Sequence, residues 1–182
     1  MAGPRGARRR EGDAAHRRAA EAASDPAERA REIALRLLTH APRSASQLRD
    51  GLLARDVDPG TAELVVDRYI EVGLLDDAAL AATIVRTRHA ERGQAGRAIR
   101  QELLRKGFDD DDIETALAQV DEDDERRRAS ELAARRWHQL ASHPDEVRTR
   151  RVVAMLGRKG YSSSLAFALV RDLRDADSQE DH

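Results

Sequence analysis

The sequence predicts an all-α protein built of three tandem three-helix repeats in an elongated, curved stack. Only 3% of the residues are aromatic although 40% are hydrophobic, so the core must consist mainly of Leu, Val, Ile and Ala. These residues recur every three or four positions, which is typical of amphipathic helices rather than strands. The same pattern returns after 51 residues and again after 53. Helical units that repeat at such a period bury their apolar faces against their neighbours, in a solenoid-like stack.

The first repeat shows three helix starts. Asp25–Pro26 supplies a capping carboxylate followed by a proline, which suits the first position of a helix. Ser44, with Gln47 three residues later, signals the start of a second helix. Asp58–Pro59 begins a third helix, and Gly73 is expected to end it.

Composition divides the chain into segments. The first two dozen residues are almost entirely Ala, Gly, Arg and acids, which cannot bury enough apolar surface to offset the entropy lost on ordering. The last residues are few and acidic, and are expected to fray. The predicted segments are a disordered basic tail at 1–24, repeats at 25–75, 76–122 and 123–174, and a frayed acidic C-terminus at 175–182.

The second and third helices of the three repeats align residue by residue. The first helices align less well, although Ile33, Ile84 and Trp137 correspond. A common register over so many apolar positions indicates a threefold duplication rather than a chance similarity of Leu-rich helices. The aligned sets are Leu48, Ile99 and Val152; Leu52, Leu103 and Leu156; Val57, Phe108 and Tyr161; Ala62, Ile113 and Ala166; and Val66, Leu117 and Val170.

Charge is segregated along the chain although the formal net charge is only -2. Residues 86–106 hold seven bases against two acids and residues 126–160 hold ten against three, whereas 109–125 holds ten acids and no base. Arginine accounts for 30 of the 32 bases; it suits bidentate phosphate contact, although a codon bias towards arginine explains much of the preference. The blocks predict one surface that attracts nucleic acid beside one that repels it.

A basic stripe is expected on the second helix of the second and third repeats. Arg97, Gln101 and Arg105 are spaced by four and share one helical face. Adding 53 carries Arg97 to Arg150 and Arg105 to Arg158, so two consecutive repeats carry the same stripe. Two interpretations remain open: contact with phosphates or with acids of a partner protein, and an ordinary solvated helix face.

No catalytic or cofactor-binding motif is recognisable. Cysteine is absent, which excludes disulfides, zinc–thiolate sites and thiol nucleophiles and fits a reducing compartment. The six histidines lack zinc-binding spacing, and no GxxxxGK, GxGxxG or GxSxG motif occurs. No apolar run approaches the roughly 20 residues that span a bilayer. We therefore expect a cytoplasmic protein that is not an enzyme and uses no metal or cofactor.

Two further features have competing interpretations. The acids of Asp109–Asp112 invite a metal site, but acids at a helix start satisfy free N–H groups and favour the helix dipole, so we expect capping. Trp137 could stack on a base. We expect it instead in the core, because it aligns with Ile33 and Ile84.

The second repeat carries the motifs of a known family. The matching segments are Leu75–Asp77, Ile84–Arg88, Gly93, Gly96–Phe108 and Ile113–Leu117. These motifs together closely resemble those of the RecX family, bacterial regulatory proteins that modulate the RecA recombinase. The combination is more specific than any single motif. The resemblance covers about residues 27–174 and is strongest in the middle repeat. The positions that match the family pattern are Arg86, Arg88, Gly93, Arg97, Glu102, Leu103, Lys106 and Gly107.

The resemblance implies a non-enzymatic regulator, mainly an inhibitor, of RecA. Members typically lie in the helical groove of the RecA filament on single-stranded DNA, where they block ATP hydrolysis and strand exchange in recombination and SOS repair. The implied partners are RecA and single-stranded DNA, with double-stranded DNA a further candidate, and we expect a monomer that binds no membrane. The alternative is a stand-alone DNA-binding helical module that acts without RecA.

The predicted partner- and DNA-binding residues are bases of the two basic blocks. They are Arg86, Arg88, Arg92, Arg97, Arg100, Arg105, Lys106, Arg128, Arg135, Arg150, Arg151, Arg158 and Lys159.

The chain departs from the family pattern at two places. Leu80–Ala81 stands where an aromatic residue followed by Ala is usual, a change that should only repack the core. Asp56 replaces the glycine expected after the second helix of the first repeat, where Gly107 and Gly160 stand in the other two. That turn is expected to hold Asp56 in the left-handed conformation.

Overall fold

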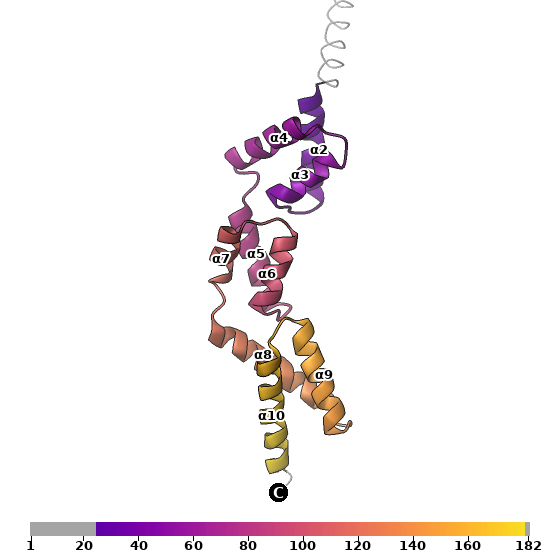
Figure 1. Ribbon diagram of the computed structural model, residues 1–182, viewed down its shortest axis with the longest axis vertical. Coiled ribbons are helices and arrows are strands. Elements are labelled where there is room, and N and C mark those ends of the chain that lie inside the picture. Colours follow the sequence, from indigo (N-terminus) through magenta and orange to yellow (C-terminus); the bar gives the residue numbers. More distant parts are fainter. Residues whose placement is uncertain (1–24, 181–182) are drawn as a thin grey trace, which may run out of the picture. The chain divides into compact units, whose positions relative to one another are not determined.

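The computed structural model describes residues 25–180, and over that range it consists of helices, turns and loops without strands. The chain divides at Asp76 into two compact units (Figure 1). The first unit holds one three-helix repeat and the second holds two, so the predicted all-α class with three three-helix repeats is confirmed. The elongated, curved stack of all three stays a prediction. The basic tail predicted at 1–24 lies outside the described residues.

The first unit contains helices α2 (Pro26–His40), α3 (Ala45–Leu53) and α4 (Pro59–Glu71). All three begin where the sequence predicted, because the expected side chains satisfy free N–H groups. The carboxylates of Asp25 and Asp58 accept hydrogen bonds from the N–H groups of Ala27 and Thr61. Ser44 and Gln47 form the reciprocal capping box.

The second unit contains two consecutive repeats. The second repeat is α5 (Asp77–Ala90), α6 (Gly96–Arg105) and α7 (Asp110–Leu117). The third is α8 (Glu122–Gln139), α9 (Asp145–Arg158) and α10 (Ser163–Glu180). Among the helices of residues 25–180, none is long and apolar enough to cross a membrane.

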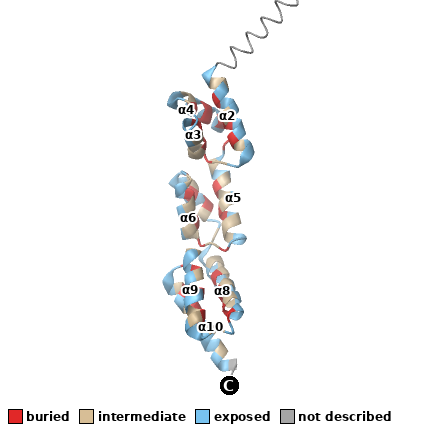
Figure 2. Ribbon diagram, turned by 90° about the vertical axis from the view of Figure 1, so that its right-hand side faces the viewer, coloured by how far each residue is buried: buried red, intermediate tan, exposed pale blue. Residues whose placement is uncertain are grey.

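Each repeat has its own core, with buried residues on the inward sides of its helices (Figure 2). The predicted register of the second and third helices is confirmed. Leu48, Ile99 and Val152 are all fully buried, because the same turn of the second helix faces the core in each repeat. The turn after that helix also recurs: Asp56 has a φ of 60°, beside 94° for Gly160. The left-handed conformation predicted for Asp56 is therefore confirmed.

The predicted alignment of the first helices is wrong by one residue in the third repeat. Trp137 is fully buried, which confirms its place in the core, but the buried positions equivalent to it are Ala34 and Val85 rather than Ile33 and Ile84. Ile33 and Ile84 are only partly buried. The cause is the spacing between the first and second helices: Trp137 and Val152 are 15 positions apart, whereas the pairs Ala34/Leu48 and Val85/Ile99 are 14 apart.

The C-terminal helix continues beyond the point where fraying was expected. Helix α10 runs to Glu180, and Asp177 ties its last turns to the third repeat. The Asp177 carboxylate accepts a hydrogen bond from Trp137 Nε1 at 2.9 Å and forms an ion pair with Arg148 Nη2 at 2.8 Å. The guanidinium of Arg148 lies 3.8 Å from the centroid of the Trp137 ring. These contacts order the described part of the acidic end.

Replacing Asp177 by asparagine should destabilise the third repeat at neutral pH, because it removes the ion pair with Arg148. We expect a loss of only about 1 kcal/mol, because the carboxylate is partly exposed. The indole N–H of Trp137, and then Arg148, lower the pKa of Asp177 below its ordinary 3.8. The unfolded chain therefore protonates first, and the stabilisation is lost as the pH falls through the lower, folded-state value. Urea unfolding followed by the fluorescence of Trp137, the chain's single tryptophan, measures this.

The difference between the wild type and Asp177→Asn should shrink below pH 3.8. Asp172→Asn is the matched control, because Asp172 is exposed on the same helix and makes no ion pair with any residue from 25 to 180. A pH-independent difference, or an equal effect of Asp172→Asn, would contradict the prediction.

Candidate nucleic-acid interface

The predicted stripes lie on exposed faces of α6 and α9. Arg97 and Arg105 on α6, and Arg150 and Arg158 on α9, are all exposed, while the opposite sides of both helices are buried in their cores. None of these four arginines forms an ion pair with another residue of the range 25–180. Their guanidinium groups are therefore available for phosphates or for carboxylates of a partner.

The end of α9 abuts the start of α6. The N–H of Ala95 donates to the carbonyl of Lys159 at 2.9 Å. A Cβ atom at Gly160 would lie 2.5 Å from the Cβ of Ala98, so only glycine allows this approach. Arg158 immediately precedes the Lys159 contact and Arg97 immediately precedes Ala98, so the last arginine of one stripe and the first of the other both stand next to the junction in sequence.

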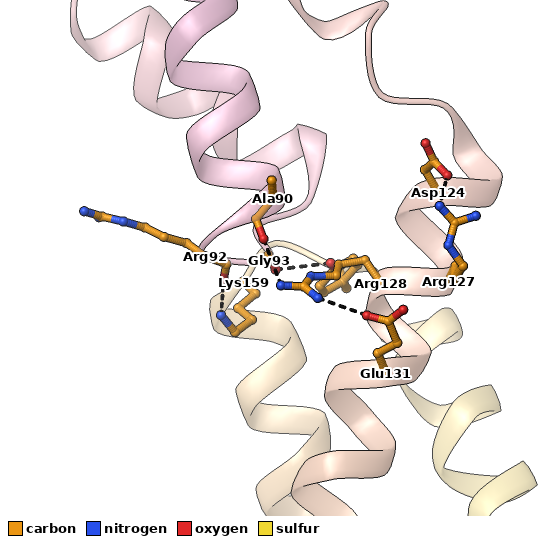
Figure 3. A network of polar contacts seen from close by, with 9 residues as sticks. Ala90, Arg92, Gly93, Asp124, Arg127, Arg128, Glu131 and Lys159 are labelled. Carbon is orange, nitrogen blue, oxygen red and sulfur yellow. Dashed lines mark hydrogen bonds and ion pairs between the residues drawn. The ribbon is translucent and has the colours of Figure 1, made fainter.

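The junction is held by polar contacts as well as by packing (Figure 3). The Lys159 ammonium donates to the carbonyl of Arg92, whose own side chain extends away from these contacts. The Tyr161 hydroxyl donates to the carbonyl of Gly93 at 3.1 Å. Burial raises the pKa of Tyr161 to about 12, so this hydroxyl stays a donor at physiological pH. Glu125 accepts from the N–H of Gly96 at 2.7 Å.

Arg128 belongs to this junction rather than to a stripe. Its Nη2 donates to the carbonyl of Ala90 at 2.9 Å, and its Nη1 pairs with Glu131 at 2.9 Å (Figure 3). The side chain is partly buried. Arg128 thus joins α8 to the end of α5, and the geometry removes it from the surface available to phosphates.

Arg88 is also engaged within the fold. Its Nε and Nη2 both donate to the carboxylate of Glu102 at 2.7 Å, and the two side chains are only 20% and 18% exposed. Arg88 occupies the position that Leu37 fills in the first repeat and Leu140 in the third. A guanidinium in a core position needs a carboxylate beside it, which Glu102 supplies. Arg88 therefore stabilises the second repeat and is not free to bind DNA.

The other predicted residues fall into three groups. Three of them have partners. Arg86 donates to the Thr83 hydroxyl, and Arg151 contacts His143. Arg100 forms ion pairs with Asp110 at 2.9 Å and with Glu114 at 3.5 Å. Arg92 and Arg135 are exposed, and Arg135 lies on α8 rather than on a stripe helix. Lys106 and Lys159 are the C-cap residues of α6 and α9. Of the predicted residues, Arg97 and Arg105 on α6 and Arg150 and Arg158 on α9 are exposed at equivalent positions of two repeats and form no ion pair within residues 25–180.

The acids between the basic blocks lie at helix starts, as predicted. Asp109 is the N-cap of α7 and Asp110, Asp111 and Asp112 form its first turn, although the Asp109 side chain makes no capping hydrogen bond. Asp121, which caps α8, accepts from the N–H of Asp124. Within the described range, no group of three or more His, Asp or Glu side chains could hold a metal ion.

Sequence reasoning missed the junction contacts of Tyr161 and Glu125. A signal for Tyr161 was present in the repeat register, because Val57 and Phe108 fill its position without a hydroxyl. That difference marks the third repeat as the one whose turn donates a hydrogen bond to its neighbour.

These features define a class of protein: a helical repeat protein whose second and third repeats are joined rigidly and present exposed arginines at equivalent positions. Sequence models of the three RecX domains match the chain in order. The first three-helix domain matches residues 30–68, the second 76–117 and the third 123–170. The chain belongs to the RecX family.

Individual relatives agree with this assignment. The regulatory protein RecX of Thermobifida fusca (strain YX) is 44% identical over 152 residues, which cover 84% of this chain and 82% of the relative. That of Streptomyces lividans is 40% identical over 156 residues, covering 86% and 83%. A crystal structure of a regulatory protein RecX has a TM-score of 0.69 at 29% identity, covering 85% of this chain and 75% of the other. RecX from Lactobacillus salivarius shares the fold, with a TM-score of 0.70 at 20% identity over 83% of this chain and 98% of that one.

Proposed function

We propose that this chain is a non-enzymatic regulator, mainly an inhibitor, of the RecA recombinase. As a monomer in the cytoplasm it binds the filament of RecA on single-stranded DNA and suppresses ATP hydrolysis and strand exchange in recombination and SOS repair. Membership of the RecX family supports a regulatory role, since its relatives are named regulatory proteins.

The observation that carries the proposal is the placement, on two abutting helices, of four exposed arginines that form no ion pair within residues 25–180. Arg150 and Arg158 on α9 are followed across the junction by Arg97 and Arg105 on α6. Phosphates recur at regular intervals along a strand, so cations that recur along two joined helices can meet several of them. A rigid chain bound to several sites along a filament would oppose the movements of neighbouring subunits that accompany their ATPase cycle.

The second candidate is a DNA-binding helical module that acts without RecA. The same unpaired arginines favour it, because bare single-stranded DNA offers the same phosphates. The two candidates differ in whether a protein surface contributes to binding.

A competition experiment distinguishes them. Labelled chain is offered RecA-coated and bare single-stranded DNA of equal length, and we expect it to partition mainly to the coated strand. Binding to bare DNA should weaken steeply with salt, by a slope of about 0.7 per phosphate contact. Binding to the coated strand should fall less steeply, because part of that interface is protein. Preference for the bare strand would establish the second candidate instead.

A further inference from the structure

The third repeat differs from the other two at the contact between its second and third helices. In the first repeat, Arg49 on α3 forms an ion pair with Glu63 on α4, with 2.5 Å between Nε and Oε2. In the second repeat the equivalent residues, Arg100 and Glu114, are paired across α6 and α7. The register that aligns the cores carries this pair to Val153 and Phe167 in the third repeat. An exposed ion pair is thus replaced by two apolar side chains.

This replacement leaves an apolar groove between α9 and α10. The groove has a volume of about 600 Å³, and Val153, Ala154 and Phe167 line its apolar part. The Phe167 ring is not covered by the chain, since the residue is 57% exposed. A large aromatic side chain in water forgoes the stabilisation that its burial would give. Because glutamate fills the same position in the other repeats, the fold does not require Phe167 there.

The charges that line the groove indicate what could cover it. Asp145 is already paired with Arg148, at 3.2 Å. Arg150 and Arg174 also line the groove and form no ion pair within the described chain, and Glu146 is the one acid there without a partner. The unpaired charges are therefore two guanidinium groups and one carboxylate. They complement a ligand that brings an apolar group together with a carboxylate.

We infer that this groove docks an acidic amphipathic segment of a protein partner, with an apolar side chain against Phe167 and a carboxylate reaching Arg174. The inference rests on the proposed function and assigns the protein part of the filament interface to the third repeat. A nucleic acid could also stack a base on Phe167. The lining by Val153 and Ala154 disfavours a phosphate backbone, because aliphatic side chains cannot compensate a phosphate for its lost hydration.

The first two repeats supply the design of the test. The double variant V153R/F167E gives the third repeat the ion pair of the other two and leaves the net charge unchanged. Val153 is partly buried against the core, so Phe167→Ser provides a second variant that alters only an exposed ring. Leu64→Ser is the matched control, because Leu64 is 72% exposed on α4 and is not one of the residues that line the groove.

Affinity is measured on RecA-coated and on bare single-stranded DNA. We expect both groove variants to bind the coated strand at least tenfold more weakly, as for loss of a central aromatic anchor, and Leu64→Ser to bind as the wild type does. Affinity for the bare strand should be unchanged. If both groove variants bind the coated strand as tightly as the wild type does, docking at the groove is overturned and the proposed function is unaffected. Failure of the wild type itself to bind the coated strand would overturn both.

Two other outcomes would replace the partner that we assign. Weaker binding of both groove variants to bare DNA would mean that Phe167 stacks on a base. Sedimentation showing that the wild type dimerises and that V153R/F167E is monomeric would make the occupant a second copy of this chain. Either result overturns docking of a partner protein segment.

Discussion

Reversing the four stripe arginines in R97E/R105E/R150E/R158E should abolish suppression of the RecA ATPase and leave the fold intact. The side chains are exposed and unpaired within the described chain, so their replacement removes no ion pair there. Each reversal turns an attraction to phosphate into a repulsion, and four together should weaken filament binding by about 100-fold or more. RecA ATPase titrations measure the functional effect, and circular dichroism measures retention of helicity.

The control must carry the same charge. Each reversal changes the charge by -2, so four reversals take the formal net charge from -2 to -10. Reversing four exposed arginines outside the stripes, namely Arg29, Arg55, Arg126 and Arg171, gives the same total. This control should still suppress the ATPase. Unchanged suppression by the stripe variant would remove the stripes from the mechanism, and equal loss in the control would reduce the effect to overall charge.

Gly160→Ala should destabilise the second unit by about 2–4 kcal/mol. The φ of 94° at Gly160 strains any side chain, and the added Cβ would lie 2.5 Å from the Cβ of Ala98 and 3.0 Å from its backbone nitrogen. Backbone cannot move aside as a flexible side chain can, so the turn must retreat from α6. Denaturant unfolding followed by the fluorescence of Trp137 measures the loss.

Two other glycines separate the causes. Gly157 lies in the last turn of α9, three residues before Gly160, with nothing within 4 Å of an added Cβ, so Gly157→Ala should be neutral or stabilising by up to about 1 kcal/mol. Gly73 has a φ of 71° and open space around it, so Gly73→Ala, followed by circular dichroism, reports the backbone strain alone. If Gly160→Ala unfolds at the same denaturant concentration as Gly157→Ala, the junction does not depend on close approach.

The same variant tests whether the stripes act together. Gly160→Ala leaves all four stripe arginines in place but displaces α9 from the start of α6. At protein concentrations where the variant is still folded, we expect weaker suppression of the RecA ATPase than with Gly157→Ala. Equal suppression would mean that each stripe binds independently of the other.

Much of the fold could be predicted because burial follows sequence period. Ile99 and Val152 are buried at the same register position because an α-helix returns the same face to the core every three or four residues. The helix starts were equally predictable, because capping depends on residues close in sequence, such as Ser44 and Gln47. Trp137 was misaligned by one position because the spacing between two helices does not show in the periodicity within either of them.

Which arginines are free could not be predicted, because that depends on contacts between helices. Arg88 and Arg97 stand in the same basic block and look alike in the sequence. Arg88 takes a core position, and it is held there by Glu102, which is 14 residues away on another helix. Arg97 has no such partner among residues 25–180. The same reasoning applies to Arg128, whose partner is a backbone carbonyl of the neighbouring repeat.

The pairing of Arg88 with Glu102 also bears on how a chain of duplicated units avoids misassembly. Tandem copies carry the hazard that a helix of one copy docks onto the wrong copy during folding. The positions of this pair hold Leu37 and Gly51 in the first repeat, and Leu140 and Met155 in the third. If α5 docked against α9, Arg88 would be buried beside a methionine without a carboxylate, at a cost of about 3–5 kcal/mol. The ion pair between Arg88 and Glu102 therefore favours docking of α5 on α6 of the same repeat, and an intermediate with α5 on α9 would be short-lived.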